Sequence, residues 1–294
     1  MKNNITIDCL NSEEWENSCK DLSGFSFFSS LAWLKYTGEV FNLENIFLKI
    51  NFNEKVIFIS IQQKEGVGFS NFIGYGGFIT DLFLTQGDIS DVLKTVEEKF
   101  NISLRRVKCF PFLDIEILKK YSQSTSFVDL SIFDGTFNLE KLNKHTRYIL
   151  KKKSSFQIKI EQVLPNNIND VYKIYQETTK RVGSAYVTPM ELFQKLSCDK
   201  NTLFISASIE GVVRAASVFF YDETTMYYWW NMSDTLGKKH YLNYYLVEFA
   251  LREAVVKKLL HFDMGSSHSE SVRLFKKNWG ANLKTFYLLE ENAH

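Results

Sequence analysis

Two stretches in the last quarter of the chain carry the residue types that could do chemistry. In the first, YYWWNMSDTLGKKHYLNYYL, a strand is expected to end near Asn231 and a helix to begin near His240. The first turn of a helix presents unpaired N–H groups and a positive dipole end, Gly237 permits close approach of a ligand, and two lysines add charge. The pattern predicts a turn that holds a pyrophosphate or another anion, although an ordinary joint with solvated lysines fits the same residues. The candidate binding residues are Asn231, Gly237, Lys238, Lys239, His240 and Asn243.

The second stretch, LLHFDMGSSHSESVRLFKKNWGANLKTFYLL, places Asp263 at the end of an expected buried strand. A loop containing Ser266 follows, and then an expected helix over residues 269–279 that carries Lys276. Ligands of α/β proteins bind beyond the carboxyl ends of strands, so this loop is a candidate site. Asp263 could accept a proton or fix a ligand, and it could equally cap the loop. Lys276 could contact a phosphate or lie on a solvated helix face.

The elements around these stretches form a regular series in the second half. The run from Thr202 to Asp234 holds three strands joined by short turns, which predicts an antiparallel meander. A helix separates the third strand from the strand LLHFDMG, so those two strands are expected to be parallel. The strands FQIKIEQV and LKTFYLLE flank the series, and the expected helices cover residues 143–153, 169–181, 189–196, 240–259 and 269–279.

The first half is also mixed. Its expected elements are a helix over residues 11–22 with Ser12 as N-cap, helices over 31–40 and 88–100, a hairpin around Asn53–Lys55, and the strands SLRRVKCFPF and FVDLSIF. Residues 135–145 look like a joint between two halves. We therefore expect an α/β fold (α+β mixed sheets) with domains at 1–135 and 136–294.

Composition limits the class of protein. The chain has 294 residues, of which 45% are hydrophobic and 23% charged, and its net charge is +1. These values are typical of a globular protein with no overall attraction to DNA. The opening residues do not resemble a signal peptide and no apolar run is long enough to cross a membrane, so a cytoplasmic location is expected. The four cysteines are scattered and no histidine lies at metal-ligand spacing, so we predict free thiols and no metal.

Several motifs resemble one family. The run FDMGSS…VRLFKKNWGA resembles the "FDFG…G…FK…WGA" ending of the GNAT-like domain in Fem-type peptidoglycan aminoacyltransferases and related N-acyltransferases. LNKHTRYILKKKSSFQIKI resembles the family's basic helix, and ETTKRVGSAY its "T-x-x-R-x-G-x-x-Y" segment. FFSSLAWLKYTG is similar to the family's "F-x-S-x-x-W" opening, and GYGGFI to its glycine-aromatic loop. The resemblance spans nearly the whole chain, and its C-terminal motif is the most specific part.

The resemblance implies two side-by-side GNAT-like domains with an acceptor bound between them. It implies an acyl-CoA donor on the C-terminal domain, a carbonyl held by backbone N–H groups of the strand Met226–Asn231, and catalytic roles for Asp263 and Lys276. Packing is the competing interpretation for each large aromatic residue of the acceptor set. The implied acceptor-binding residues are Trp33, Lys35, Tyr75, Arg105, Arg147, Tyr186, Trp230 and Ser266.

The expected function is N-acyl transfer from acyl-CoA to a phosphate-activated amine, such as a nucleotide-linked amino sugar for surface polysaccharide. One alternative is a tRNA-dependent aminoacyltransferase that acts on a peptidoglycan precursor. Against it, the chain has no heptad-bearing insertion of the kind that longer family members use for aminoacyl-tRNA, and the common glycine after the "FDFG" loop is replaced. The other alternative is a non-catalytic binding protein that keeps the fold.

Overall fold

The computed structural model describes residues 5–152, 156–184, 186–267 and 269–290. The chain forms two compact units: unit 1 comprises Met1–Ser124 and Lys284–His294, and unit 2 comprises Thr125–Leu283. The expected boundary after residue 135 therefore lies inside unit 2. The last strand, which was expected in the second domain, contributes most of its residues to unit 1.

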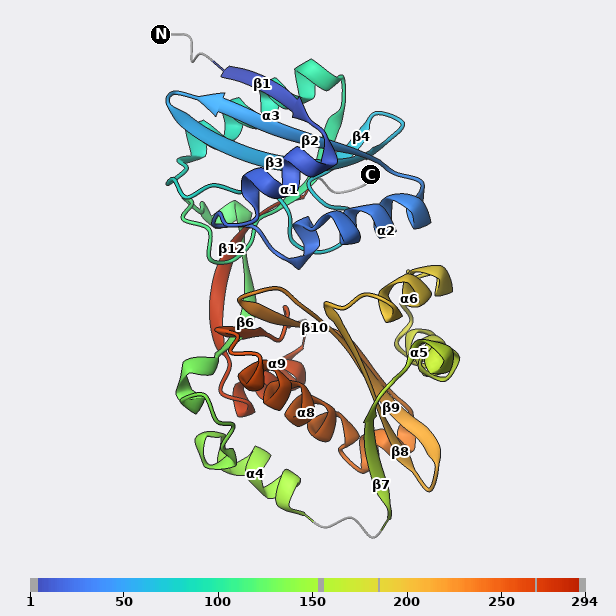
Figure 1. The fold of residues 1–294 in the computed structure, drawn as a ribbon. Helices are drawn as coiled ribbons and strands as arrows, with labels where there is room; N and C mark the ends of the chain where they lie inside the picture. Colours follow the sequence, from blue (N-terminus) through green and yellow to red (C-terminus); the bar gives the residue numbers. More distant parts are fainter. Residues whose placement is uncertain (1–4, 153–155, 185, 268, 291–294) are drawn as a thin grey trace. The chain divides into compact units, whose positions relative to one another are not determined.

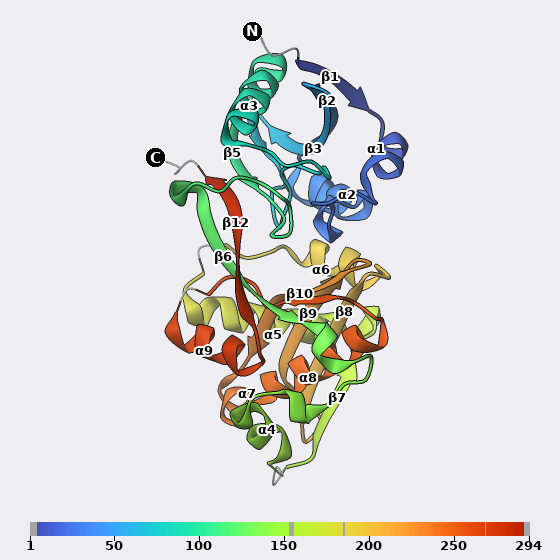
Figure 2. The same ribbon diagram turned by 90° about the vertical axis from the view of Figure 1, so that its left-hand side faces the viewer.

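Unit 1 is a curved sheet between helices. The strand order is β1-β2-β3-β4-β5-β12, and every pair is antiparallel except β4–β5. Figure 2 shows α3 on one side of this sheet and α1 and α2 on the other. The elements are β1 Ile5–Leu10, α1 Ser12–Cys19, α2 Leu31–Phe41, β2 Glu44–Phe52, β3 Lys55–Lys64, β4 Val67–Phe69, α3 Gln86–Phe100, β5 Ser103–Lys108 and β12 Asn282–Glu290.

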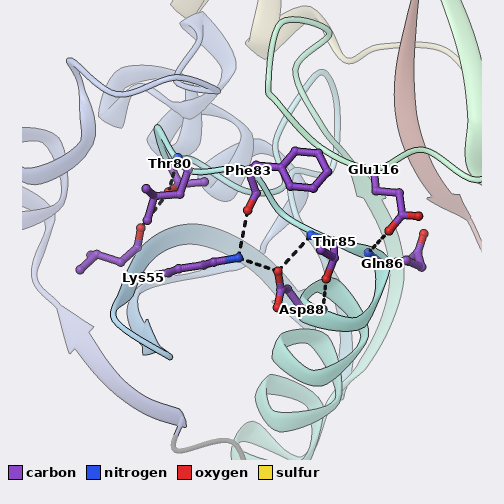
Figure 3. Close-up of polar contacts among 9 residues, drawn as sticks. Lys55, Thr80, Phe83, Thr85, Gln86, Asp88 and Glu116 are labelled. Carbon is purple, nitrogen blue, oxygen red and sulfur yellow. Dashed lines mark hydrogen bonds and ion pairs between the residues drawn. The ribbon is translucent and has the colours of Figure 1, made fainter.

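The start of α3 shows how local sequence determines an element of unit 1. Thr85 and Asp88 form a reciprocal capping box, in which each side chain accepts the other residue's backbone N–H. Lys55 Nζ donates to Asp88 Oδ2 at 2.7 Å and to the Phe83 carbonyl at 3.0 Å (Figure 3). The hairpin is thereby tied to the helix that packs on it.

Unit 2 contains the parallel strand pair. Its strand order is β6-β11-β10-β9-β8-β7, and β10–β11 is its one parallel pair among the described strands. Helices α5 and α6 lie on one side of the sheet, and α8 and α9 lie on the other (Figure 1). The elements are β6 Ser122–Asp129, α4 Lys144–Lys151, β7 Ile158–Gln162, α5 Ile168–Val182, α6 Met190–Ser197, β8 Thr202–Ile209, β9 Val212–Tyr221, β10 Thr225–Ser233, α7 Thr235–Lys239, α8 Leu242–Val256, β11 His261–Asp263 and α9 Glu270–Asn278.

The predicted elements are present, with local corrections. The N-cap of α1 is Asn11, which forms a capping box with Glu14, so Ser12 is the first helical residue and not the cap. The run FVDLSIF is extended only to Asp129 and then turns through a short 3-10 helix. Strand β1 was not predicted. The end of the predicted basic helix, at residue 153, lies outside the described residues.

Candidate active site

The two parallel strands of unit 2 separate after a short pairing. Strand β11 pairs with β10 from Thr225↔His261 to Tyr227↔Asp263 and then ends. Strand β10 continues to Ser233. Within the described chain, its edge beyond Tyr227 has no neighbouring strand on the β11 side. The separation leaves a place at the carboxyl ends of the strands where a ligand could pair with backbone.

The free part of β10 contains a β-bulge. Tyr228 faces Phe219 of β9, whereas Trp230 faces Val218, so Trp229 is the extra residue. The bulge changes which side chains share a face, because Tyr228 and Asn231 now lie on the same side of the sheet. Bulges of this kind re-aim backbone and side chains beside functional sites.

Asp263 organises the loop that follows β11. Its Oδ1 accepts a hydrogen bond from Thr125 Oγ1 at 2.7 Å and another from the Gly265 N–H at 2.8 Å, and the side chain is buried. Asp263 therefore caps the loop, which is one of the two roles predicted for it. That oxygen holds the loop in the observed conformation.

Lys276 holds the same loop from helix α9. Its Nζ donates to the carbonyl oxygens of Gly265 at 2.8 Å and Ser266 at 2.6 Å. The residue is only 5% exposed, so it does not lie on a solvated helix face. Burial lowers its pKa to about 8, an effect that nearby Asp263 partly offsets. A buried lysine beside a strand end is a feature of functional sites rather than of ordinary helix surfaces.

Gly265 brings the loop close to the edge of β10. Its φ of +77° lies in the left-handed region, and a Cβ added there would lie 3.8 Å from Lys276 Nζ and 4.0 Å from the Tyr228 carbonyl oxygen. The loop, the lysine and the first unpaired residue of β10 therefore meet at one point.

The turn after β10 differs from the predicted one. A short helix, α7, begins at Thr235, and the Gly237 N–H donates to the Asp234 side chain at 2.7 Å. A Cβ on Gly237 would lie 2.3 Å from the Arg214 carbonyl oxygen, so this glycine permits contact with β9. The prediction that a helix starts at His240 was wrong, because the chain breaks at Tyr241 (φ +57°) before α8 begins. The His240 ring instead packs edge-on against Phe156.

The beginning of α8 remains suited to an anion. No side chain caps it, and Asn243 in its first turn has a buried Oδ1 that makes no hydrogen bond within the described protein. Asn231, Lys238 and Lys239 are exposed beside this turn.

Arg181 is a cation that was not among the predicted binding residues. It donates from Nη2 to the Ser233 carbonyl at 3.0 Å, which places the end of α5 at the end of β10. Burial and the charge of Arg181 both lower the pKa of Lys238, so the two cations are close together. The "T-x-x-R-x-G" resemblance was the available signal, since Thr178 also bonds Ser233 through the Ser233 N–H and carbonyl.

Two predicted acceptor residues of unit 1 are buried. Trp33 is fully buried among aromatic rings and donates from Nε1 to the Ile73 carbonyl at 3.2 Å. Tyr75 is buried against Phe28, and Lys108 lies over its ring. These contacts fit the packing interpretation of both aromatics.

The predicted cations of unit 1 are placed differently. Lys35 is exposed, 4.0 Å from Glu39, and lines a surface pocket of about 470 Å³ between α1, α2 and β2. Arg105 is half-buried. Its neighbour Arg106 is the desolvated one: burial lowers its pKa, and it donates to the Phe72 carbonyl.

The remaining predicted residues lie in unit 2. Arg147 on α4 pairs with Glu140. The Trp230 ring stacks on the Phe193 ring, with 4.6 Å between the ring centroids, on the α6 side of the sheet. Tyr186 is partly exposed, and burial together with Tyr175 raises its pKa to about 12. Ser266 is exposed and contributes its carbonyl to Lys276.

The described residues contain no cluster of three or more His, Cys, Asp or Glu side chains that could hold a metal ion. No helix among them combines the length and the apolar character that crossing a bilayer requires.

No protein-family model matches the chain, and no curated protein matches it.

Solved structures do resemble it. FemX superposes with a TM-score of 0.62 at 9% identity over 96% of each chain. A conserved protein of unknown function from Bacteroides thetaiotaomicron superposes with a TM-score of 0.58 at 12% identity, over 98% of this chain and 100% of that chain. A tandem GNAT protein from the clavulanic acid biosynthesis pathway superposes with a TM-score of 0.55 at 8% identity, over 99% of this chain and 100% of that chain. At such identities the likeness shows the fold. The chain thus shares its fold with FemX and with a tandem GNAT protein, and the prediction of two GNAT-like domains is confirmed.

Proposed function

We propose that the protein is an N-acyltransferase that moves an acyl group from acyl-CoA to an amine. The observation that carries the proposal is the separation of β10 from β11, with a bulge in β10 and a loop held by Lys276 opposite it. A thioester can lie along such a strand edge and accept a hydrogen bond from its backbone. The GNAT-like fold supports the same reaction class.

The residues of unit 2 divide the work of this reaction. The acceptor nitrogen forms a bond to the acyl carbon while the C–S bond breaks, and the leaving thiolate takes up the proton that the nitrogen loses. Tyr228–Asn231 orient the carbonyl. Lys276 fixes the loop and supplies a positive charge close to the strand edge, where negative charge develops in the transition state. Asp263 positions that loop.

The donor's phosphates fit the turn between β10 and α8. Arg181 and Lys238 supply two neighbouring cations, and the uncapped start of α8 with Asn243 supplies hydrogen-bonding groups. Lys239 is exposed at the end of α7, and Asn231 is exposed near the end of β10.

For the acceptor we propose a nucleotide-linked amino sugar used in surface polysaccharide synthesis. Within unit 2, Arg147 is the cation assigned to its phosphates, Ser266 a polar contact and Tyr186 the partly exposed aromatic contact.

The test combines binding and turnover. Wild-type protein should bind CoA in calorimetry and release free thiol when acetyl-CoA is mixed with UDP-glucosamine. Arg181→Gln should weaken CoA binding by about tenfold to a hundredfold, because a hydrogen bond to a charged group contributes about 1.5–3 kcal/mol. Lys180→Gln, one residue away on α5, is the matched control and should bind normally. Equal loss in both variants, or no CoA binding by the wild type, would reject the donor assignment.

The likeness to FemX keeps a tRNA-dependent aminoacyltransferase as the second candidate. This second candidate predicts transfer from an aminoacyl-tRNA to a peptidoglycan precursor and no response to CoA. A protein that melts at the same temperature with and without CoA, acetyl-CoA and alanyl-tRNA would instead fit a binding protein that has kept the fold.

A further inference from the structure

Unit 1 contains a surface pocket of about 470 Å³ that the proposed function does not use. This volume lies within the range of about 300–1,000 Å³ that is usual for small-molecule sites. Residues of α1, α2 and β2 line the pocket, and both helices lie on the same side of the sheet (Figure 2). All of its lining residues belong to unit 1, so the pocket is complete within that unit.

The wall of the pocket is mainly apolar. Leu31 on α2, Leu43 between α2 and β2, and Phe47 on β2 line it, and the protein leaves each of them only half-buried. The Phe47 ring packs on the fully buried Trp15, with 5.2 Å between the ring centroids, so the ring is held in place. An apolar side chain in the pocket would remove this exposed surface from water, and an aromatic one would also gain a ring contact with Phe47.

A hydrogen-bond network fixes the spacing of the two walls. Asn45 lines the pocket from β2, its Nδ2 donates to the Leu34 carbonyl at 3.1 Å, and its Oδ1 accepts from Gln62 Nε2 at 2.9 Å. Gln62 is fully buried and also donates to Thr37 Oγ1 of α2 at 2.8 Å. Gly38 permits this close approach, since a Cβ there would lie 2.9 Å from Asn45 Nδ2. The pocket between α2 and β2 is therefore preformed, as ligand sites usually are.

Two opposite charges lie on the α2 side of the pocket. Lys35 Nζ and Glu39 Oε1 are 4.0 Å apart, one helical turn from each other, and their side chains are 71% and 44% exposed. An ion pair with this exposure contributes little to stability. A ligand with a single charge would meet one attractive and one repulsive group here. A ligand with both charges can place a carboxylate on Lys35 and an ammonium on Glu39, and an α-amino acid carries these two groups on one carbon.

We propose that this pocket binds an α-amino acid with a large apolar side chain. The side chain lies against Leu31, Leu43 and Phe47, and the head group pairs with Lys35 and Glu39. The site goes beyond the proposed acyl transfer, whose residues belong to unit 2.

Calorimetric titration of the whole protein with four probes tests each part of the ligand. L-Phenylalanine carries both charges and a ring, 3-phenylpropionate lacks the ammonium, 2-phenylethylamine lacks the carboxylate, and glycine lacks the ring. Phenylalanine should bind about three- to fivefold more tightly than either single-charge probe, because each exposed ion pair adds a modest free energy. Glycine should not bind measurably, because it cannot cover the apolar wall.

Two variants locate the ligand. Lys35→Gln should remove the advantage of phenylalanine over 2-phenylethylamine, and Glu39→Gln should remove its advantage over 3-phenylpropionate. Lys94→Gln and Glu98→Gln are the matched controls, because Lys94 and Glu98 form the same kind of exposed pair on α3, at 3.8 Å, and do not line the pocket. Both controls should bind all four probes as the wild type does.

Three outcomes would overturn the proposal. The first is no binding of phenylalanine by the wild type at about 1 mM. The second is equal affinity for phenylalanine and both single-charge probes, which would reject the pairing of the head group. The third is unchanged selectivity in Lys35→Gln and Glu39→Gln, which would place the ligand outside this pocket. CoA binding by the same protein tests the acyl-transfer proposal separately, so either proposal can fail while the other stands.

Discussion

Lys276 is an ammonium group held inside unit 2 by two carbonyl oxygens of the loop that follows β11. The sequence could not reveal this burial, because a lysine in a polar helix is ordinarily solvated. Its matching position in the family motif did indicate a role. Arg181 shows the opposite case: its segment matched a motif, but only the contact with Ser233 points to the donor turn.

Replacing Lys276 by methionine should lower acyl transfer at least tenfold without unfolding the protein. Methionine has a similar length but cannot donate to Gly265 and Ser266, so the loop loses both hydrogen bonds. Transfer rate and circular dichroism measure the two effects. Lys277→Met changes the exposed neighbour and should be silent. Full turnover by Lys276→Met would remove the residue from the mechanism.

The buried lysine also predicts a pH effect on stability. Its pKa is about 8 in the folded protein and about 10.4 in an unfolded chain, so the unfolded state binds more protons between these values. The free energy of unfolding should therefore rise with pH across this window, as the cost of burying the cation is relieved. Urea unfolding of the wild type and of Lys276→Met at pH 7 and pH 9.5 should show that rise only in the wild type. A parallel response in both proteins would contradict it.

Asp88 predicts a pH dependence of the same sign in unit 1, but in the acid range. Burial acts to raise its pKa, but hydrogen bonds from Lys55 and Thr85 outweigh it and hold the pKa below the usual range. The stabilisation is therefore present above about pH 4, the unfolded value, and is lost as pH falls below it. Asp88→Asn should lower the free energy of unfolding by ~1 kcal/mol at pH 7, and the difference from wild type should shrink in acid.

The control for that variant is Glu98→Gln on the same helix, since Glu98 lies exposed in a pair with Lys94. It should change stability by less than ~0.5 kcal/mol. If both variants lost the same free energy of unfolding, the capping box at Asp88 would not contribute specifically to stability.

At the scale of the element, the loop from Gly265 to Ser267 is what brings α9 and β10 together. Gly265→Ala should reduce transfer at least tenfold, because its Cβ would enter the space between Lys276 Nζ and the β10 edge. The positive φ adds a backbone cost of about 1–2 kcal/mol. Gly211→Ala is the matched control: its φ is +79° and no atom lies within 4 Å of the added Cβ. It should lose similar stability and no activity, and equal activity loss in both would refute the steric argument.

Most elements could be predicted from the sequence because their signals are local. The α3 helix follows from its apolar spacing and the β2–β3 hairpin from two β-rich runs around a turn. The short helix α7 and the break after it could not be predicted, since residues 237–240 carry no apolar side chain at helical spacing and the break is marked by the left-handed Tyr241. The bulge at Trp229 was equally hidden, because its evidence is the register against β9.

At the scale of the whole molecule, the chain order and the units do not coincide. Residues 284–294 come last in the chain, yet they belong to unit 1, where Leu288–Glu290 pair with Arg106–Lys108 of β5. The sequence interpretation placed this strand in the second domain because it follows α9 directly. Only the long-range pairing assigns it to unit 1, and patterns within a short window carry no information about that pairing.

Tyr287 tests this assignment, since it is fully buried in the core cluster of unit 1 and lies beside Tyr121. Tyr287→Ala should cost unit 1 about 3–5 kcal/mol, because a large buried aromatic leaves a cavity. Hydrogen exchange should accelerate in α3 and β5 while β9 and β10 keep their protection. Met226→Ala, in the core of unit 2, should give the opposite pattern. If Tyr287→Ala instead exposed β9 and β10, the C-terminal strand would be part of the cooperative unit that holds the candidate site, and the two units would not unfold independently.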